Sequence, residues 1–250
     1  MSIVSFLKIM ARINKSKKLA KYRQNPGLNQ RLPNYSVKMG FGLHVGWAIE
    51  GAIGSDFKID ASYLSPNVNM ASRLEAATKQ FGVPLLISGE IYKVCSAETK
   101  KQLRWIDRVT VKGSIQPIDL YTVDVDYGKI KVNTKEIDIS TLKDIEKKKA
   151  RVHARNARND LKENALAGRT KVGKSFYIDK DISRLRDPFH SDFYKKFSEG
   201  MDNYISGNWA KAREIFERTK TMIPGREDGP SNTILNFMSS LNGRAPPNWK

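Results

Sequence analysis

Residues 39–125 form a charge-balanced block between two basic segments, and this division most constrains what the chain can fold into. The block holds nine basic and nine acidic residues, whereas residues 1–38 hold nine basic residues and no acidic one. Residues 126–187 hold seventeen basic against ten acidic residues, so most of the net charge of +18 lies outside the block. The pattern indicates a folded domain flanked by a basic arm and a basic linker, with a further segment at 188–250.

The composition excludes several classes of protein. With 250 residues, of which 40% are apolar, the chain can bury the core of one or two domains, which rules out wholesale disorder. The single cysteine, Cys95, excludes a disulfide framework and a multi-cysteine metal centre, and it indicates a reducing compartment. The longest apolar runs, such as Val83–Ile87, are far shorter than the roughly 20 residues that cross a bilayer, so the chain itself is not expected to span a membrane.

The basic arm, residues 1–38, begins with a pattern that is typical of an amphipathic helix. A membrane-surface helix and a mitochondrial presequence both fit this pattern, as does a helix whose apolar stripe packs on the following domain. Pro26 and Pro33 end the helical pattern and predict a loop. The apolar residues at helical spacing are Ile3, Phe6, Leu7, Met10 and Ile13.

Strands alternate with helices in residues 39–125, and a pair of strands closes the block. This order predicts an α+β fold in which helices cover one face of a mainly antiparallel sheet. A helix is expected over 68–81, capped by Asn67 and closed by Gly82. The expected strands are 39–47, 50–55, 61–66, 83–88, 103–111 and 118–125, with a second helix at about 89–95.

Asn69 and Arg73 carry the spacing that points to chemistry. They lie four residues apart, which places both side chains on one face near the start of the expected helix. An amide and a guanidinium aimed at one point suit a sugar hydroxyl and phosphate oxygens. The same spacing is also compatible with a helix cap and a solvated side chain.

Several segments of the block, taken in order, resemble the C-terminal half of a class III adenylate/guanylate cyclase catalytic domain. They are Gly40–Gly46, Glu50–Gly54, Val68–Glu75, and Val109–Gly113 with Pro117 and Leu120-Tyr121. The resemblance covers roughly residues 39–125 and implies a ferredoxin-like half-domain that dimerises with a second cyclase domain, as a homodimer or a heterodimer. It further implies conversion of ATP or GTP to a 3′,5′-cyclic nucleotide and pyrophosphate, in intracellular signal transduction.

The resemblance assigns roles to four residues by motif position. Asn69 matches the asparagine that orients the ribose, and Arg73 matches the arginine that stabilises the charged, five-coordinate phosphorus. Lys112 lies in the turn whose lysine meets the terminal phosphate. Ser62 occupies the base-recognition position, and because a serine hydroxyl both donates and accepts hydrogen bonds, the choice between ATP and GTP stays open.

Two features depart from the family pattern. The family's two metal-binding aspartates precede the strand that begins here at Met39, and the first acid of this chain is Glu50. Ligands for Mg²⁺ or Mn²⁺ are therefore expected from a partner or from a missing N-terminal half, and the chain is expected to be inactive alone. The loop 65–67 reads Ser-Pro-Asn, where many members have Gly-Asp-Thr or Gly-Asn-Thr. A catalytically inactive nucleotide-binding or protein-docking module is the alternative.

The basic linker, residues 126–187, is expected to contain a solvated helix around 147–158. Nucleic acid is not an expected partner, because no aromatic residues are interleaved with the basic ones in that run. Residues 168–175 satisfy the phosphate-loop expression G-x-x-x-x-G-K-[ST]. We reject that class of loop, because a charged helical stretch precedes the motif where a buried strand is required.

The last segment, residues 188–250, resembles a single tetratricopeptide-type helical hairpin. One such hairpin cannot bury its own apolar face, so we expect it to pack on the preceding domain or on a protein partner. The three histidines, His44, His153 and His190, are too scattered for a metal site, and His44 is expected in the core. The resemblance places the chain at the cytoplasmic face, with a parent protein that can be attached to a membrane through other segments.

Overall fold

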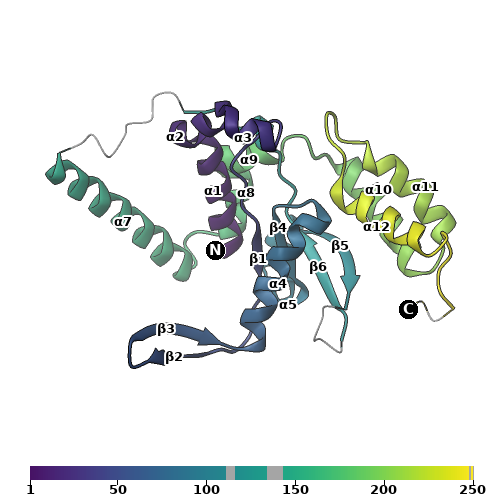
Figure 1. Cartoon of the computed structure of the whole chain (residues 1–250), viewed down its shortest axis with the longest axis horizontal. Coiled ribbons are helices and arrows are strands. Elements are labelled where there is room, and N and C mark those ends of the chain that lie inside the picture. Colours follow the sequence, from purple (N-terminus) through teal and green to yellow (C-terminus); the bar gives the residue numbers. More distant parts are fainter. Residues whose placement is uncertain (111–115, 134–142, 248, 250) are drawn as a thin grey trace. The chain divides into compact units, whose positions relative to one another are not determined.

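The computed structural model describes residues 1–110, 116–133, 143–247 and 249, and it divides into two compact units (Figure 1). Met1–Val37 and Asp126–Leu185 form the first, here called the basic unit. Lys38–Val125 and Arg186–Lys250 form the second, here called the sheet unit. Each unit is thus assembled from two separate stretches of chain. The expected basic arm and basic linker form one unit, and the expected domain at 39–125 forms the other with the C-terminal segment.

A four-stranded sheet organises the sheet unit, with the strand order β1-β4-β6-β5. β1 pairs with β4 in parallel, with Phe41 opposite Leu85, while β4–β6 and β6–β5 are antiparallel. Two of the three pairings are antiparallel, which confirms the expectation of a mainly antiparallel sheet. The parallel pair was not expected; helix α4 lies between β1 and β4 in the chain and provides the crossover that such a pair requires. The strands are β1 (Phe41–Leu43), β4 (Leu85–Ser88), β5 (Arg104–Val109) and β6 (Ile118–Thr122).

Helix α4 (Pro66–Phe81) confirms the helix expected over 68–81. Its N-cap is Ser65, whose hydroxyl accepts a hydrogen bond from the Asn67 amide at 2.9 Å, so the assignment of Asn67 as the cap is wrong. Pro66 occupies the first turn, where its missing N–H costs nothing. Gly82 ends the helix in the left-handed conformation, at φ 63°.

Of the strand expected at 39–47, only the three residues of β1 are in strand conformation, and α4 packs closely against them. A Cβ atom at Gly42 would meet the Ala71 carbonyl oxygen and lie 2.5 Å from the Glu75 amide nitrogen. Only glycine allows this approach of strand to helix.

Cys95, the single cysteine, is half-buried at the end of α5 (Gly89–Val94).

Three C-terminal helices complete the core of the sheet unit. Phe197, Phe216 and Trp209 share one buried cluster with Ile106 and Leu120 of the sheet. The helical hairpin therefore packs on the sheet of its own chain, one of the two arrangements expected. The helices are α10 (Ser191–Ile205), α11 (Trp209–Lys220) and α12 (Gly229–Ser240), and the short α6 (Ala97–Lys100) precedes β5.

A buried ionic cluster joins β5, the end of the sheet and α12. Arg104 donates hydrogen bonds to Asp124 at 2.6 and 2.9 Å and to Asp228 at 2.8 and 3.1 Å. All three side chains are at most 5% exposed. The guanidinium also lies over the rings of Phe193 and Phe197, 4.9 and 4.3 Å from their centroids. Burial alone would lower the pKa of Arg104, but the two carboxylates outweigh it and raise that pKa.

Asp107 is also buried, but among the described residues no cationic side chain is paired with it. It follows an irregularity in the β5–β6 pairing between Trp105 and Asp107, and it accepts a hydrogen bond from the Arg108 amide at 2.8 Å. Burial raises the pKa of Asp107 from 3.8 to about 7. The folded state therefore holds this proton more tightly than the unfolded state, and the carboxyl group destabilises the fold progressively as the pH rises from about 4 to about 7.

We expect Asp107→Asn to remove this pH dependence, because the amide is neutral at every pH. The variant should gain about 2 kcal/mol of unfolding free energy relative to the natural protein between pH 5 and pH 6.5, at about 1.4 kcal/mol per pKa unit. Urea denaturation at the two pH values measures the difference. A difference that does not change with pH would show that Asp107 titrates normally.

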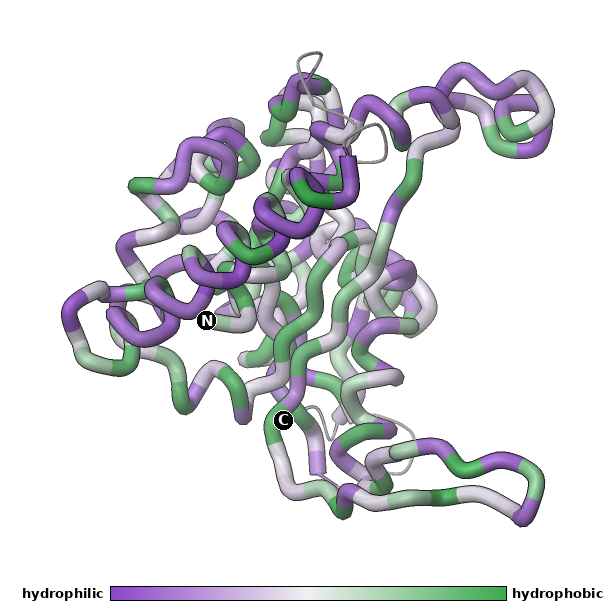
Figure 2. The backbone as a smooth tube through the Cα atoms, turned by 90° about the vertical axis from the view of Figure 1, so that its left-hand side faces the viewer, coloured by the Kyte–Doolittle hydropathy of each residue, from purple (hydrophilic) through white to green (hydrophobic). Residues whose placement is uncertain are grey.

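The β2–β3 hairpin stands apart from the sheet. β2 (Ile49–Ser55) pairs with β3 (Lys58–Leu64) over its full length, and the hairpin extends away from α4 and the sheet (Figure 1). Apolar residues recur along it, as Figure 2 shows. The hairpin is exposed throughout except for half-buried Ser62.

The basic unit is all helical in the part that the structure describes. Its first helix, α1 (Ser2–Lys15), buries Leu7 and Met10, while Phe6 and Ile13 are half-buried. Phe176, Ile182 and Leu185 of the same unit are also buried. The other elements are α2 (Lys17–Ala20), η1 (Lys21–Gln24), α3 (Pro26–Arg31), η2 (Tyr127–Lys129), α7 (Asp144–Leu166), η4 (Val172–Lys174), α8 (Ser175–Ile178) and α9 (Lys180–Arg186).

The expected basic linker is therefore largely helical. Helix α7 confirms the solvated helix expected at 147–158, since it buries none of its residues. Among the described residues, no helix has the length and apolar character needed to cross a membrane.

Candidate functional site

Asn69 and Arg73 lie on the exposed face of α4, one helical turn apart. The opposite face of the helix, with Leu74, Thr78 and Phe81, is buried. Within the described residues, neither the side-chain amide of Asn69 nor the guanidinium of Arg73 has a hydrogen-bond or ion-pair partner. The helix is thus fixed by its packing while both side chains keep their full hydrogen-bonding capacity, as a binding pair requires.

The two other predicted site residues are placed differently. Ser62 lies on β3, opposite Gly51 of β2, and is half-buried. β3 ends one residue before the Ser65 cap, so Ser62 is linked to the start of α4 by a short, defined stretch of chain. Lys112 lies outside the described residues. The structure thus brings Asn69 and Arg73 together, and no contact of either with Ser62 is described.

A hydrogen-bond network fixes the start of α4. His44 Nε2 lies 3.2 Å from Asn67 Oδ1, and His44 Nδ1 lies 2.8 Å from Ser88 Oγ. Asn67 Nδ2 and Ser65 Oγ both donate to the Trp47 carbonyl, at 2.9 and 2.6 Å. The side-chain nitrogen of Asn67 is the donor to Trp47, so the side-chain oxygen is free to accept a hydrogen bond from His44 Nε2–H. With its proton on Nε2, the His44 ring accepts a hydrogen bond from the Ser88 hydroxyl at Nδ1. The network connects the residue after β1, the end of β4 and the start of α4.

This network was not expected from the sequence. His44 was expected in the core, whereas its side chain is half-buried and hydrogen-bonded at both ring nitrogens. The clue was Gly46, two residues on, where a Cβ atom would collide with the Asn67 side chain. A glycine beside a histidine, at the point where a strand leaves the sheet, indicates a close approach of two segments.

Exposed apolar side chains recur along the β2–β3 hairpin, and Trp47, two residues before it, is exposed as well. Phe57 at its tip is 99% exposed, and the others are more than half exposed. Apolar residues recur on both faces of the ribbon, so no side of it is purely polar. So many exposed large apolar side chains on one hairpin indicate an interaction site. The residues are Trp47, Ile49, Ile53, Phe57, Ile59, Tyr63 and Leu64.

The described residues do not provide a metal site. No group of three or more His, Cys, Asp or Glu side chains in the described ranges lies close enough together to hold a metal ion. The groups at the exposed start of α4 are an amide and a guanidinium, and a guanidinium repels cations. The residues near Asn69 and Arg73 therefore do not fit Mg²⁺ or Mn²⁺ by themselves.

Comparison with known proteins gives relatives that are all adenylate cyclases. The chain is 39% identical over 93 residues to an adenylate cyclase of Anabaena cylindrica and 32% identical over 92 residues to adenylate cyclase 1 of Rhizobium meliloti. It is 30% identical over 89 residues to the terminal-differentiation-specific adenylate cyclase of Dictyostelium discoideum. These matches cover 37%, 37% and 35% of the chain, but only 18%, 13% and 4% of the relatives.

No family model matches the chain. Two solved structures of a bacterial light-regulated adenylyl cyclase match at 34% and 29% identity, with TM-scores of 0.29 and 0.35. They cover 34% and 49% of this chain and 23% and 32% of the matched chains. The sequence relationship shows that the chain is related to adenylate cyclases and spans less than a fifth of the length of its curated relatives.

Proposed function

We propose that this chain supplies the transition-state half of a nucleotidyl cyclase site, of the class III type, with Asn69 and Arg73 as its catalytic residues. The exposed, unpartnered pair on a packed helix, in a chain related to adenylate cyclases, carries the proposal. ATP or GTP is the substrate, and a 3′,5′-cyclic nucleotide and pyrophosphate are the products.

The roles follow from the chemistry of the two side chains. The ribose 3′-hydroxyl attacks the α-phosphorus, and the bond to the pyrophosphate oxygen breaks. Arg73 donates to the phosphate oxygens, where negative charge accumulates, and Asn69 hydrogen-bonds the ribose and holds the hydroxyl in line. Lys112 is proposed to bind the terminal phosphate, and Ser62 to face the base.

A second cyclase domain completes the proposed site. The apolar surface of the β2–β3 hairpin supports pairing with such a domain, because the exposed side chains would be buried by it. Since the residues at Asn69 and Arg73 do not fit a divalent cation, we place the ligands for Mg²⁺ or Mn²⁺ on the partner or on an upstream segment. The cation would supply charge neutralisation on the phosphates.

Complementation tests the proposal. Formation of cyclic nucleotide from ATP and from GTP is measured with Mg²⁺ or Mn²⁺ for this chain alone, and then for a mixture with a cyclase domain that keeps its metal-binding aspartates but lacks the Asn/Arg pair. Activity in the mixture alone is expected. Silence in both samples, from folded chains that associate, would contradict the proposal.

A non-catalytic nucleotide-binding or docking module is the second candidate. The loop 65–67 favours this candidate, because the side chains of Ser65 and Asn67 both donate hydrogen bonds to the Trp47 carbonyl. These groups stabilise the loop and are not directed at a ligand. In that case the mixture stays silent while the chain still binds a nucleotide or the second domain.

Ser62→Asp tests the proposed base-recognition position. A carboxylate accepts a hydrogen bond from the exocyclic amino group of adenine but repels the guanine O6, so the ratio of ATP to GTP turnover in the complemented mixture should rise by about ten-fold. Parallel rate measurements with the two substrates give the ratio. An unchanged ratio would show that base choice lies elsewhere.

A further inference from the structure

Helix α7 is the longest helix that the structure describes, and none of its 23 residues is buried (Figure 1). It belongs to the basic unit, which contains neither Asn69 nor Arg73, so the proposed cyclase function does not use it. In proteins, most of the stability of a helix comes from the packing of one face. A long helix with no buried face is therefore a candidate for packing against a separate molecule.

An apolar strip runs along α7 with a period of seven residues. Ile145, Val152 and Leu166 recur at this spacing, and Asn159 occupies the remaining position of the series. These four residues, here called the heptad strip, lie two turns apart on nearly the same side of the helix. Ile145 and Leu166 are 71% and 78% exposed, and Val152 is 47% exposed. Such a repeat is typical of one strand of a coiled coil, in which a single polar Asn often interrupts the apolar series.

A row of cations borders the heptad strip on one side. Arg151, Arg155, Arg158 and Lys162 are spaced by four, three and four residues, so they lie above one another on the helix. This row is here called the cation stripe. Among the described residues, none of the four side chains has a hydrogen-bond or ion-pair partner. In a heptad they occupy the positions next to the apolar one, g and d, which face a partner strand.

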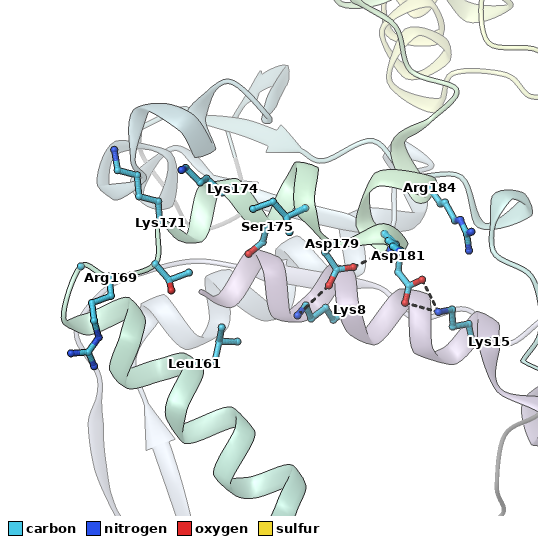
Figure 3. Close-up of a pocket in the computed structure, with 14 residues that line it drawn as sticks. Lys8, Lys15, Leu161, Arg169, Lys171, Lys174, Ser175, Asp179, Asp181 and Arg184 are labelled. Atoms are coloured by element: carbon cyan, nitrogen blue, oxygen red, sulfur yellow. Dashed lines mark hydrogen bonds and ion pairs between the residues drawn. The ribbon is translucent and has the colours of Figure 1, made fainter.

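The other side of α7 faces its own unit near the end of the helix. Leu161 lines a cavity there together with Lys8 of α1 and Ser175 of α8, as Figure 3 shows. Val152 lies nine positions before Leu161, which is about half a turn around a helix of 3.6 residues per turn. The heptad strip therefore lies on the side of the helix away from this cavity, where a partner can reach it.

The charges of α7 discriminate between the candidate occupants of this face. A second copy of α7 is disfavoured, because the helix holds seven basic against four acidic residues and the cations at positions d and g of two copies would repel each other. A membrane surface requires a wide apolar face, whereas the heptad strip is narrow. A nucleic acid would pair with the cation stripe but leave the apolar side chains in water. An acidic amphipathic helix matches both features.

We propose that α7 binds an acidic amphipathic helix of another protein as a two-stranded coiled coil. The partner helix has an apolar residue at every seventh position, which packs on the heptad strip, and carboxylates beside it, which pair with the cation stripe. Layers of apolar contacts then alternate with layers of ion pairs. Asn159, polar at an otherwise apolar position, weakens the complex but fixes its register.

Titration calorimetry on the full chain tests the proposal, with two synthetic peptides as probes. The first has leucine at every seventh position and glutamate at the positions that face the cation stripe. The second contains the same amino acids in scrambled order and thus carries the same charge. We expect one copy of the first peptide to bind per chain, and the scrambled peptide to bind at least about ten-fold more weakly. Equal binding would reduce the interaction to attraction by a chain of net charge +18 and would overturn the proposal.

A pair of apolar variants tests the heptad strip. Val152→Gln should weaken binding of the first peptide by about five- to ten-fold, because it removes an apolar layer while glutamine keeps the helix. Leu161→Gln is the matched control, since Leu161 is 42% exposed, close to the 47% of Val152, but lies on the other side of the same helix. Its affinity should change by less than about two-fold. Equal losses in the two variants would contradict binding through the heptad strip.

A pair of charge variants tests the cation stripe. Arg155→Gln with Lys162→Gln should weaken binding of the first peptide by about ten-fold or more, because two ion pairs at the interface are lost. Lys21→Gln with Arg31→Gln removes the same charge from exposed positions elsewhere in the basic unit and should change the affinity by less than about two-fold. Losses of the same size in both double variants would overturn the proposal.

Asn159→Leu gives an independent readout with the opposite sign. The substitution completes the apolar series of the heptad strip, so the first peptide should bind several-fold more tightly. A short RNA duplex serves as the competing probe, because its backbone gains nothing from an added apolar side chain. Duplex binding that depends on Arg155 and Lys162, without tighter peptide binding by Asn159→Leu, would assign this face to nucleic acid and overturn the proposal.

Discussion

Arg104→Ala is expected to lower the free energy of unfolding by about 3–5 kcal/mol. The substitution leaves Asp124 and Asp228 facing each other, buried and without their common cation. It also removes the guanidinium from the rings of Phe193 and Phe197, and it weakens the contact between the sheet and α12, whose N-cap is Asp228. Urea denaturation followed by tryptophan fluorescence measures the loss.

Arg108→Ala is the matched control. Arg108 lies on the same strand and pairs with Asp119 at 2.7 Å, but the two side chains are 43% and 30% exposed. An exposed pair of this kind contributes about 0–1 kcal/mol. Similar losses in the two variants would show that burial of the Arg104 cluster does not determine its contribution.

Arg73→Ala is expected to reduce cyclic nucleotide formation in the complemented mixture by about 100-fold or more, because it removes a donor that acts on charge developing in the transition state. Folding should be nearly unchanged, since the side chain is exposed and has no described partner. Initial rates and thermal unfolding of the same preparations measure the two effects.

Lys79→Ala is the control for this second prediction. It removes a positive charge from the exposed last turn of the same helix, away from the Asn69–Arg73 pair. Its rate should stay within about two-fold of the natural protein. A rate that is insensitive to Arg73→Ala would exclude Arg73 from the mechanism.

Local patterns predicted the parts of the fold that depend on neighbouring residues. Helix α4 could be located from Pro66, Gly82 and the periodic apolar positions, because capping and amphipathicity act within a few residues. The common face of Asn69 and Arg73 followed from the same periodicity. The catalytic roles of the two residues remain predictions.

Long-range pairing was not predictable in this way. Arg104 and Asp228 are 124 positions apart, and nothing near either residue indicates the other. The parallel pairing of β1 with β4 likewise depends on how α4 crosses the sheet. An amphipathic stripe such as that of α1 shows that a face is buried, but not which segment covers it.

The choice between Ser65 and Asn67 as cap shows the same limit on a smaller scale. Both residue types cap helices well, so propensity does not separate them. The Trp47 carbonyl, which lies 18 and 20 positions earlier in the chain, accepts from both side chains and fixes the loop with Ser65 as the cap. A contact beyond the local window decided the outcome.

The interleaved order of the two units affects how the protein can be synthesised and folded. When the strands of the sheet unit leave the ribosome, Ile106 and Leu120 share their cluster with Leu74 of α4 but lack the helices that carry Phe197 and Phe216, which are translated later. At about 5–20 residues per second, this delay is on the order of ten seconds. The nascent sheet is therefore a natural client for chaperones, and a protease cut between residues 125 and 186 would divide the chain between two segments that share one buried core.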